Sequence, residues 1–566
     1  MTPTDARLYE PAPDPQAAIV TESAAVARIL VSAEPSFLED FAARELQDYI
    51  LRISGASLPI VVEGEASADC FALAIGATNA ADAAGIVPDE RVMGRDGFTM
   101  RSDGEALVIR GSNDLGTLFG VYELLERHFG VRWYMPGEIG EVVPEAETLS
   151  LGQIDLTFKP SFRVRWVGDG EWGLHQRMNA FVTAEGRDVG VNWKWHFHTF
   201  RRLIPPEEYH GEHPEYFALV DGERKITDSK THGNQLCTSN PDVVREVGQN
   251  MIEVLDEDPS IEIIALSPND GGGFCECERC EALDEPGRDW FAKYSRRLAL
   301  FNNEVARLVA GKHPDVMIKV GAYAMYARPP LDPDWRSEDN LLWQLCHIYF
   351  CHNHPLGSDR CEAGETFEPS DDFRPNREYE RILEQWTEIA EHLFIYEYYT
   401  LGGVSGAGLP WPLVHTIRTD IPWYRDRGAE GFYTQLSDEL FYRQGINYYL
   451  ATKLAWNADL DPDALLADYF SGFYGRAAGP MEHFWMALEQ AMIDWDRCSS
   501  YGLDGTADAS LGSKVFTPEV MEGVGEALEE AEAAVTAERV YEERVALARR
   551  MYDETQATLA ELRAEQ

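Results

Sequence analysis

Short apolar runs alternate with segments of helical periodicity over the first 155 residues. Leu118, Val121, Leu124 and Leu125, for example, fall on one face of a helix. The pattern predicts strands at residues 26–32, 71–75 and 107–110 and helices at residues 36–53 and 116–129. We therefore expect a small N-terminal α/β domain over residues 1–155.

From residue 156 to residue 455, apolar runs of strand length alternate with longer amphipathic segments, as in parallel α/β proteins. The predicted strands are residues 162–168, 180–183, 235–238, 261–267, 316–322, 341–348, 392–398 and 431–435. The predicted helices are residues 241–255, 289–311, 376–390 and 413–427. Eight strands over this length predict a (β/α)8 barrel of the TIM type. A doubly wound sheet is the alternative, but no G-x-G-x-x-G or phosphate loop supports its nucleotide-binding form.

The remaining residues, 456–566, have helical patterns at 463–472, 478–494, 518–537 and 538–565. They predict a helical region that follows the barrel. The expected fold class is thus α/β, with three parts at 1–155, 156–455 and 456–566.

Charge and composition exclude several classes of partner. The chain has 49 Lys and Arg against 97 Asp and Glu, a net charge of −48, so it lacks the basic surface that nucleic acid binding needs. No stretch has the roughly 20 apolar residues of a membrane span, and the first ten residues do not resemble a signal peptide. We expect the chain as given to be cytoplasmic, and a homo-oligomer is compatible with its sequence.

The fourth barrel strand runs into Ser-Pro-Asn-Asp-Gly-Gly-Gly at residues 267–273. Catalytic groups of barrels lie at carboxyl ends of strands, and glycines let a substrate approach the backbone. Asn269 and Asp270 are therefore predicted to orient and polarise a reacting group, although an Asn-Asp-Gly turn without chemistry is the simpler alternative.

Strand 7 contains Glu397 among aromatic residues, where partial desolvation would suit a general acid. The alternative is a Glu paired with an Arg of the adjoining helix. Tyr398 follows on the same strand, and Asp438 and Glu439 follow strand 8, so all three are predicted to lie at the same end of the barrel.

Residues 193–219 are dense in histidines and aromatic residues, a composition that suits a carbohydrate site because rings stack on sugar faces. We predict that Trp195, His198, His213 and Glu215 hold the sugar. Any one of these histidines could instead have a structural role.

Nine cysteines are spread unevenly, and Cys275, Cys277 and Cys280 form C-x-C-x-x-C. Three thiols at this spacing suggest a structural zinc completed by a distant ligand, while a disulfide or free thiols are equally compatible. The sequence does not choose among the candidate fourth ligands, which are Cys237, Cys346, Cys351, Cys361 and His354. No cofactor is expected for catalysis itself.

These motifs resemble a known family. Residues 267–277, 212–219, 235–237 with 240–241, and 130–137 are similar to the bacterial family catalogued as domain of unknown function 4838. That family is linked to glycoside hydrolase family 163, whose members are endo-β-N-acetylglucosaminidases. The leading region looks like the domain that precedes the barrel in family 20 hexosaminidases and family 67 α-glucuronidases.

The resemblance implies a glycoside hydrolase acting on N-acetylhexosamine-containing glycans, with the substrate's own 2-acetamido group as nucleophile. Asn269-Asp270 stands where family 20 has Asp-Glu, and Glu397 stands near a position where the resembled family commonly has Asp. Two alternatives stay open. An α-glucuronidase-like hydrolase would need an arginine such as Arg165, Arg328 or Arg360 for the sugar carboxylate, and a non-catalytic carbohydrate-binding protein would keep the barrel alone.

Overall fold

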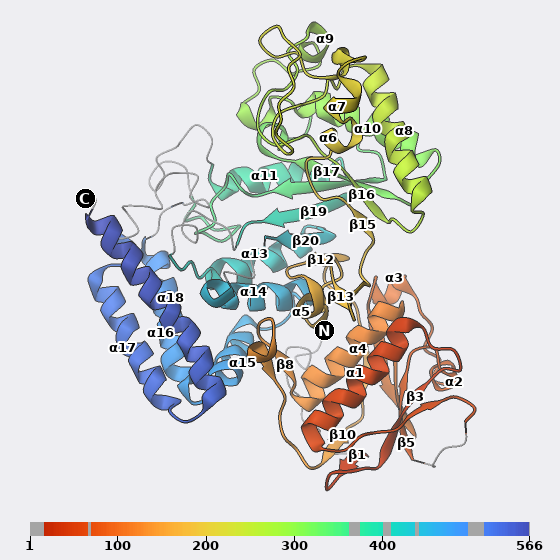
Figure 1. Ribbon diagram of the computed structural model, residues 1–566, viewed down its shortest axis with the longest axis vertical. Helices are drawn as coiled ribbons and strands as arrows, with labels where there is room; N and C mark the ends of the chain where they lie inside the picture. Colours follow the sequence, from red (N-terminus) through yellow and green to blue (C-terminus); the bar gives the residue numbers. More distant parts are fainter. Residues whose placement is uncertain are drawn as a thin grey trace.

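The computed structural model describes residues 16–65, 70–361, 374–399, 409–435, 441–495, 498 and 514–564. Figure 1 shows three parts along the chain: an N-terminal sheet with two long helices, a central parallel sheet surrounded by helices, and a group of C-terminal helices. No helix in the described ranges is long and apolar enough to cross a membrane.

The N-terminal part is built on a six-stranded mixed sheet. In spatial order its strands are β11 (Asp155–Phe158), β6 (Phe98–Ser102), β7 (Ala106–Gly111), β5 (Phe71–Ile75), β3 (Ala27–Val31) and β4 (Ile60–Val62). Helices α1 (Phe37–Ser54) and α4 (Asp114–Phe129) lie side by side against it (Figure 1). The predicted strands and helices of this region are confirmed. A separate three-stranded sheet contains β1 (Ala17–Thr21), β2 (Ala24–Ala25) and β10 (Leu149–Leu151).

Helix α1 shows how local sequence sets these boundaries. The Ser36 side chain accepts a hydrogen bond from the Glu39 backbone, and the Glu39 carboxylate accepts one from the Ser36 backbone. This reciprocal cap satisfies amides that the helix leaves unpaired. Gly55, at φ 75°, ends the helix in a left-handed conformation that a glycine adopts without strain.

The central sheet is parallel throughout and curls into a barrel. Its order is β12 (Val164–Trp166), β20 (Gly431–Thr434), β19 (His392–Glu397), β18 (Leu341–Cys346), β17 (Met317–Ala322), β16 (Ile263–Leu266) and β15 (Trp193–Lys194). β20, the last barrel strand along the chain, pairs with β12, the first barrel strand. The barrel class is thus confirmed, with seven strands in the described residues where the sequence predicted eight.

Residues 179–191 occupy the place of the missing strand. Ala180 N–H donates to the Arg165 carbonyl over 3.3 Å, and Val191 N–H donates to the Asn179 carbonyl over 2.7 Å. Between these bonds the chain makes a small hairpin of β13 (Thr183–Ala184) and β14 (Arg187–Asp188). The predicted strand at 180–183 is therefore reduced to a single bridge.

A second predicted strand was wrong. Residues 235–238 pair outside the barrel, with the irregular segment around Tyr216 and Ala218, through Ala218 N–H to the Gln235 carbonyl and Cys237 N–H to the Tyr216 carbonyl. The position next to β16 belongs to β15, which is two residues long and shows no periodicity in the sequence.

Helices pack around the outside of the barrel: α8 (Pro241–Glu257), α10 (Ser295–Ala310), α11 (Asn376–Thr387), α13 (Val414–Asp426) and α14 (Phe441–Trp456). The barrel interior has its own aromatic core, which includes Trp166, Trp193, Phe394, Tyr396 and Tyr433. Because successive strand side chains face opposite sides, each strand contributes one row to this interior and one row to the layer beneath the helices.

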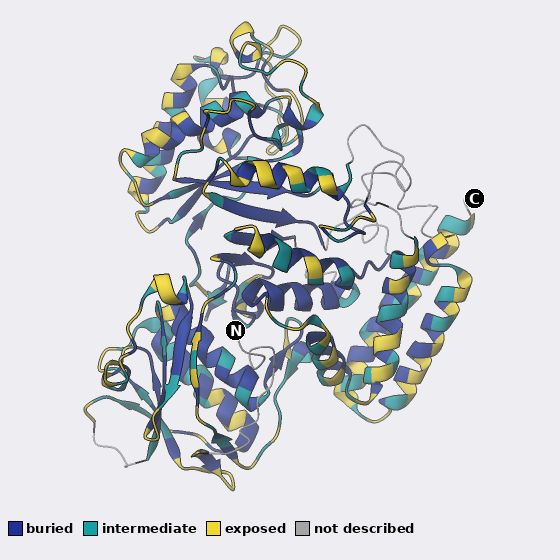
Figure 2. Cartoon of the chain, turned by 180° about the vertical axis from the view of Figure 1, so that it is seen from behind, coloured by how far each residue is buried: buried dark blue, intermediate teal, exposed yellow. Residues whose placement is uncertain are grey.

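Within its described residues the C-terminal part has four α-helices: α15 (Pro462–Tyr474), α16 (Ala478–Trp495), α17 (Pro518–Ala534) and α18 (Arg539–Ala564). They confirm the predicted helical segments. Figure 2 shows buried and exposed residues alternating along them, as expected for amphipathic helices that pack by one face.

Candidate active site

A cavity of about 250 Å³ lies at the carboxyl ends of the barrel strands. Strands β17, β18 and β19 and the segments that follow β15, β16 and β20 contribute to it. Its lining residues are Phe197, His198, Ser267, Pro268, Asp270, Gly321, Tyr323, Tyr326, Gln344, Cys346, Ile348, Tyr396, Tyr398 and Gln435. This is the end of a barrel where active sites are found, and an apolar hollow with a few polar groups is typical of a ligand site.

Aromatic rings form one wall of the cavity. Tyr396 and Tyr398 are stacked with their centroids 4.2 Å apart, and Phe197 stacks on Tyr396 at 5.3 Å. Gln435 donates a hydrogen bond to the Tyr396 hydroxyl. Flat rings with hydroxyl groups at their edges suit the apolar faces and hydroxyls of a sugar.

Asp270 is the one carboxylate among the described lining residues. Its side chain is 32% exposed, its Oδ1 accepts a hydrogen bond from Gly271 N–H at 2.8 Å, and its Oδ2 lies 3.4 Å from His232 Nε2. His232 comes from a distant loop that pairs with the Asp270 backbone, and no motif in the sequence indicates this contact. The carboxylate is thus oriented from two sides and still reaches the cavity.

Asn269 has a different position from the one predicted. Its amide donates to the Gly233 carbonyl at 2.9 Å and to the Asn234 carbonyl at 3.2 Å, and the side chain is buried. The Asn269 backbone also exchanges hydrogen bonds with the Gln235 side chain, at 2.6 and 3.1 Å. Asn269 does not line the cavity, so it fixes the loop that carries Asp270 and does not polarise a substrate.

Glu397 requires a correction as well. Tyr396 and Tyr398 face the cavity, so Glu397, between them, faces the helices on the other side of β19. It is fully buried there, with His347 Nδ1 at 3.1 Å and a hydrogen bond from the Tyr424 hydroxyl of α13. The alternative, an Arg partner from the adjoining helix, is not found among the described residues either, because these contacts are to histidine and tyrosine. A carboxylate in this position cannot protonate a sugar held in the cavity.

His198 reaches the cavity from a strained segment after β15. Trp195 and His198 both have a positive φ, of 59° and 57°. This conformation is strained for residues other than glycine, and such strain is often found at functional sites. His198 Nδ1 lies 3.3 Å from the Pro268 carbonyl, and burial lowers the pKa of its imidazole while the Asp270 charge opposes that shift. Trp195 is not among the lining residues and packs against the main core.

The other residues predicted to contact the substrate have three different outcomes. His213 and Glu215 contact each other at 3.1 Å, about half exposed, and neither lines the cavity. Tyr398 does line it, with a buried side chain. Asp438 and Glu439 lie outside the described residues.

Lys319 lies inside the barrel on β17 and was not predicted. Its ammonium donates hydrogen bonds to the His196 carbonyl and, at 2.9 Å, to Gln344 Oε1, a side chain that lines the cavity. The group also lies 3.9 Å from the centre of the Phe197 ring. Burial lowers the Lys319 pKa to about 7. A lysine on an otherwise apolar strand could have been noticed in the sequence, but its inward direction could not.

The arginines considered for an acidic sugar are engaged elsewhere. Arg165 is fully buried and pairs with Asp96 at 3.2 Å, Arg328 pairs with Asp289 and Glu378, and Arg360 donates to the Ile493 carbonyl at 3.1 Å. None of the three lines the cavity.

A second cavity, of about 290 Å³, lies at the amino-terminal edge of the same sheet. Its lining includes the beginnings of strands, such as Val164, Ile263 and Phe394, together with Arg95 and Glu262, which pair with each other. This end of a barrel contributes to stability, so the first cavity is the candidate active site.

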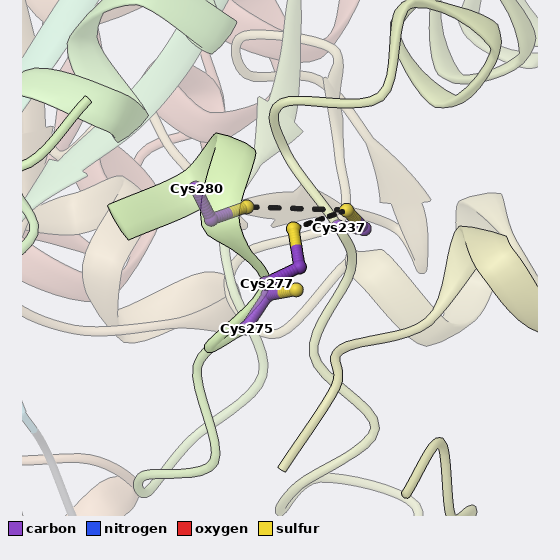
Figure 3. A group of neighbouring side chains, drawn as sticks. All are labelled: Cys237, Cys275, Cys277 and Cys280. Atoms are coloured by element: carbon purple, nitrogen blue, oxygen red, sulfur yellow. Dashed lines mark hydrogen bonds between the residues drawn. The ribbon is translucent and has the colours of Figure 1, made fainter. Parts of the chain in front are cut away.

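Four cysteines come together next to the Asp270 loop, and Figure 3 shows their sulfur atoms converging. Cys237 Sγ lies 3.7 Å from Cys277 Sγ and 3.9 Å from Cys280 Sγ, and with Cys275 the four sulfurs lie within 4.8 Å of one another. In a tetrahedral zinc site with Zn–S bonds of roughly 2.3 Å, neighbouring sulfurs are about 3.8 Å apart. The C-x-C-x-x-C motif thus has Cys237 as its fourth member, and this set could hold Zn²⁺.

Comparison with known sequences gives two family matches. Residues 135–486 match the family described as "Domain of unknown function (DUF4838)", and residues 9–124 match "Glycosyl hydrolase family 67 N-terminus". No curated protein matches the chain.

Two solved structures align with the chain at low sequence identity. A family GH115 4-O-methyl-α-glucuronidase with specificity for decorated arabinogalactans aligns over 97% of this chain and 76% of its own, with 11% identity and a TM-score of 0.53. The chitobiase of Flavobacterium johnsoniae aligns over 100% of this chain and 94% of its own, with 11% identity and a TM-score of 0.42. The first of these likenesses shows a shared fold.

Proposed function

Because the chain belongs to the family described as domain of unknown function DUF4838, whose match covers its whole barrel, we propose that this barrel is the catalytic part of a glycoside hydrolase. The observation that carries the proposal is the position of Asp270, a carboxylate aimed into an aromatic cavity at the carboxyl end of the strands. The glycoside hydrolase N-terminus matched by residues 9–124 supports the same class.

The substrate we propose is an N-acetylhexosaminide. Asp270 accepts a hydrogen bond from the N–H of the sugar's 2-acetamido group, which directs the amide oxygen to the anomeric carbon. That oxygen forms the new bond as the glycosidic bond breaks, and water then opens the cyclic intermediate with retention of configuration. The tyrosine wall stacks on the sugar ring.

The leaving-group oxygen needs a proton when the glycosidic bond breaks. Glu397 cannot supply it, because it lies behind the cavity wall. We propose Asp438 or Glu439 for this role, because both follow β20 in the sequence and are predicted to lie at this end of the barrel.

An α-glucuronidase activity is the second candidate, favoured by the likeness to the GH115 enzyme. Arginine normally binds the carboxylate of a uronic acid through two parallel hydrogen bonds. No arginine is found among the described residues that line the cavity, and this favours the uncharged N-acetylhexosaminide.

A panel of aryl β-N-acetylhexosaminides, aryl uronosides and N-glycans tests the proposal. We expect cleavage of N-acetylhexosaminides, inhibition by a thiazoline analogue of the cyclic intermediate, and slower cleavage when the N-acetyl group is replaced by N-trifluoroacetyl, a poorer nucleophile. Cleavage of uronosides alone would favour the second candidate. Glycan binding by calorimetry without any turnover would indicate a carbohydrate-binding protein.

We also propose that Cys237, Cys275, Cys277 and Cys280 hold a structural zinc. Four thiolates leave no open position for water, so the metal would stabilise the loop and take no part in hydrolysis. Cys275 follows Asp270 by five residues, and Cys237 follows Gln235, the residue bonded to Asn269. The zinc would therefore fasten both loops that orient Asp270.

A further inference from the structure

We propose that Cys351, His354, Cys361 and Cys498 form a second metal site, which takes Zn²⁺ and joins the barrel to the C-terminal helices. Their ligand atoms lie within 4.8 Å of one another, and no side chain of the four is more than 2% exposed. The site is separate from the candidate active site and from the Cys237 cluster, and it does not depend on the proposed activity.

The distances fit a tetrahedral cation. His354 Nδ1 lies 3.5 Å from Cys351 Sγ and 3.5 Å from Cys498 Sγ, and Cys361 Sγ lies 3.3 Å from Cys498 Sγ. With bonds of roughly 2.3 Å to sulfur and 2.0 to 2.1 Å to nitrogen, tetrahedral zinc places sulfur and nitrogen about 3.6 Å apart and two sulfurs about 3.8 Å apart. A disulfide would need sulfurs at about 2.0 Å. A bound metal accounts for an imidazole nitrogen that lies close to two thiols, whereas a disulfide between two cysteines does not.

The ligands come from two distant parts of the chain. Cys351, His354 and Cys361 lie in the segment after β18, whereas Cys498 follows α16, 137 residues beyond Cys361. Other contacts hold the same two parts together: Asn353 donates to the Met492 carbonyl at 3.1 Å, and Arg360 donates to the Ile493 carbonyl at 3.1 Å. The ligand set therefore sits where the barrel segment meets the end of α16.

Asn376, the first residue of α11, supports this set in the way that outer groups support metal ligands. Its N–H donates to Cys361 Sγ at 3.2 Å, and its side-chain amide donates to the His354 carbonyl at 2.7 Å. Its Oδ1 lies 3.0 Å from Nε2 of His347, the residue that contacts Glu397. A continuous chain of contacts thus runs from the proposed metal site to Glu397 on β19, the strand whose Tyr396 lines the cavity.

Zinc binding at this site would release the protons of its three thiols into solvent. The neutral imidazole completes the four ligands, so no position is left for water. The site is closed and structural.

Metal analysis of the full chain, expressed with zinc and purified under reducing conditions, tests the proposal. Cys498→Ser is expected to lower the zinc content by one ion per chain relative to wild type. Cys70→Ser is the control, because Cys70 belongs to neither cluster and contacts Arg28. An unchanged zinc content in Cys498→Ser, or a Cys361–Cys498 disulfide found by peptide mapping of the wild type, would overturn it.

A measurement on wild-type protein covers the case in which the variant does not fold. X-ray absorption at the zinc edge is expected to show mainly sulfur ligands together with the outer-shell scattering of an imidazole. The Cys237 cluster offers sulfur alone. A spectrum with only sulfur neighbours would therefore contradict the Cys₃His site while leaving the Cys₄ site intact.

Discussion

Glu397 and Tyr398 are adjacent in the sequence, and their side chains lie on opposite sides of the barrel wall. The Tyr398 ring lines the cavity, and the Glu397 carboxylate is buried against His347 and Tyr424. Of the two carboxylates that the sequence indicates most strongly, only Asp270 can contact a ligand in the cavity. Substitutions at the two positions should therefore have different kinds of effect.

Asp270→Asn is expected to lower kcat/KM by a factor on the order of 10² to 10³, the usual loss when one preorganised hydrogen-bonding group that stabilises the transition state is removed. The midpoint of thermal unfolding should change little, because the side chain is partly exposed. Steady-state kinetics on the best aryl glycoside measures the effect. Glu215→Gln is the matched control, since Glu215 lies outside the cavity, and an equal loss in both variants would contradict the assignment.

Glu397→Gln is expected to destabilise the protein by about 1 to 3 kcal/mol, the cost of leaving buried hydrogen-bonding groups unsatisfied. Urea unfolding of the variant and of wild type measures this difference. The pH dependence of kcat/KM should keep its shape, because Glu397 does not contact the substrate. A variant of normal stability that has lost one limb of its pH profile would restore Glu397 as a catalytic acid.

Lys319 gives a prediction about stability and pH. Burial lowers its pKa from 10.5 to about 7 in the folded protein. Between these values the unfolded chain binds more protons, so this residue makes stability rise with pH, by up to about 1.4 kcal/mol per pH unit. Below pH 7 both states are protonated and the cost of burying the charge is present in full.

The Lys319→Met variant lacks this contribution. We expect the difference in unfolding free energy, wild type minus Lys319→Met, to increase from pH 7 towards pH 10 in urea titrations. Lys312→Met is the control, because Lys312 is about half exposed and pairs with Asp256 on the surface. A difference that is independent of pH would show that Lys319 titrates normally.

Removal of metal should weaken the loop that carries Asp270. A zinc chelator is expected to lower the thermal midpoint before it affects turnover, because the proposed Cys₄ zinc is structural. Cys277→Ser should also lower the thermal midpoint. In this variant the chelator should lower the midpoint less than it does in wild type, because the contribution of the Cys₄ site is already lost. Native protein with less than one zinc per chain and four freely titratable thiols in this cluster would refute the Cys₄ site.

Sequence patterns predicted most of the architecture, and the misses have physical causes. β19 is buried on both faces, so its sequence has no alternation to tell which side chains point inward, and Glu397 was placed on the wrong face. β15 is too short for any periodicity. Asp270 was found because a glycine-rich turn follows a buried strand. Lys319, His232 and the approach of Cys498 to Cys361 depend on contacts between distant segments, which no local pattern records.

The hairpin at residues 179–191 gives the barrel wall a mechanical weak point. In the described residues every other junction between neighbouring barrel strands is a parallel ladder, whereas here the wall is held by single bonds such as Ala180 to Arg165. Local opening takes place where the fewest hydrogen bonds must break. Hydrogen exchange should therefore be faster at the Ala180 and Val191 amides than in β17 or β18. We therefore expect the barrel to open first along this seam, on the side of β12 and β15.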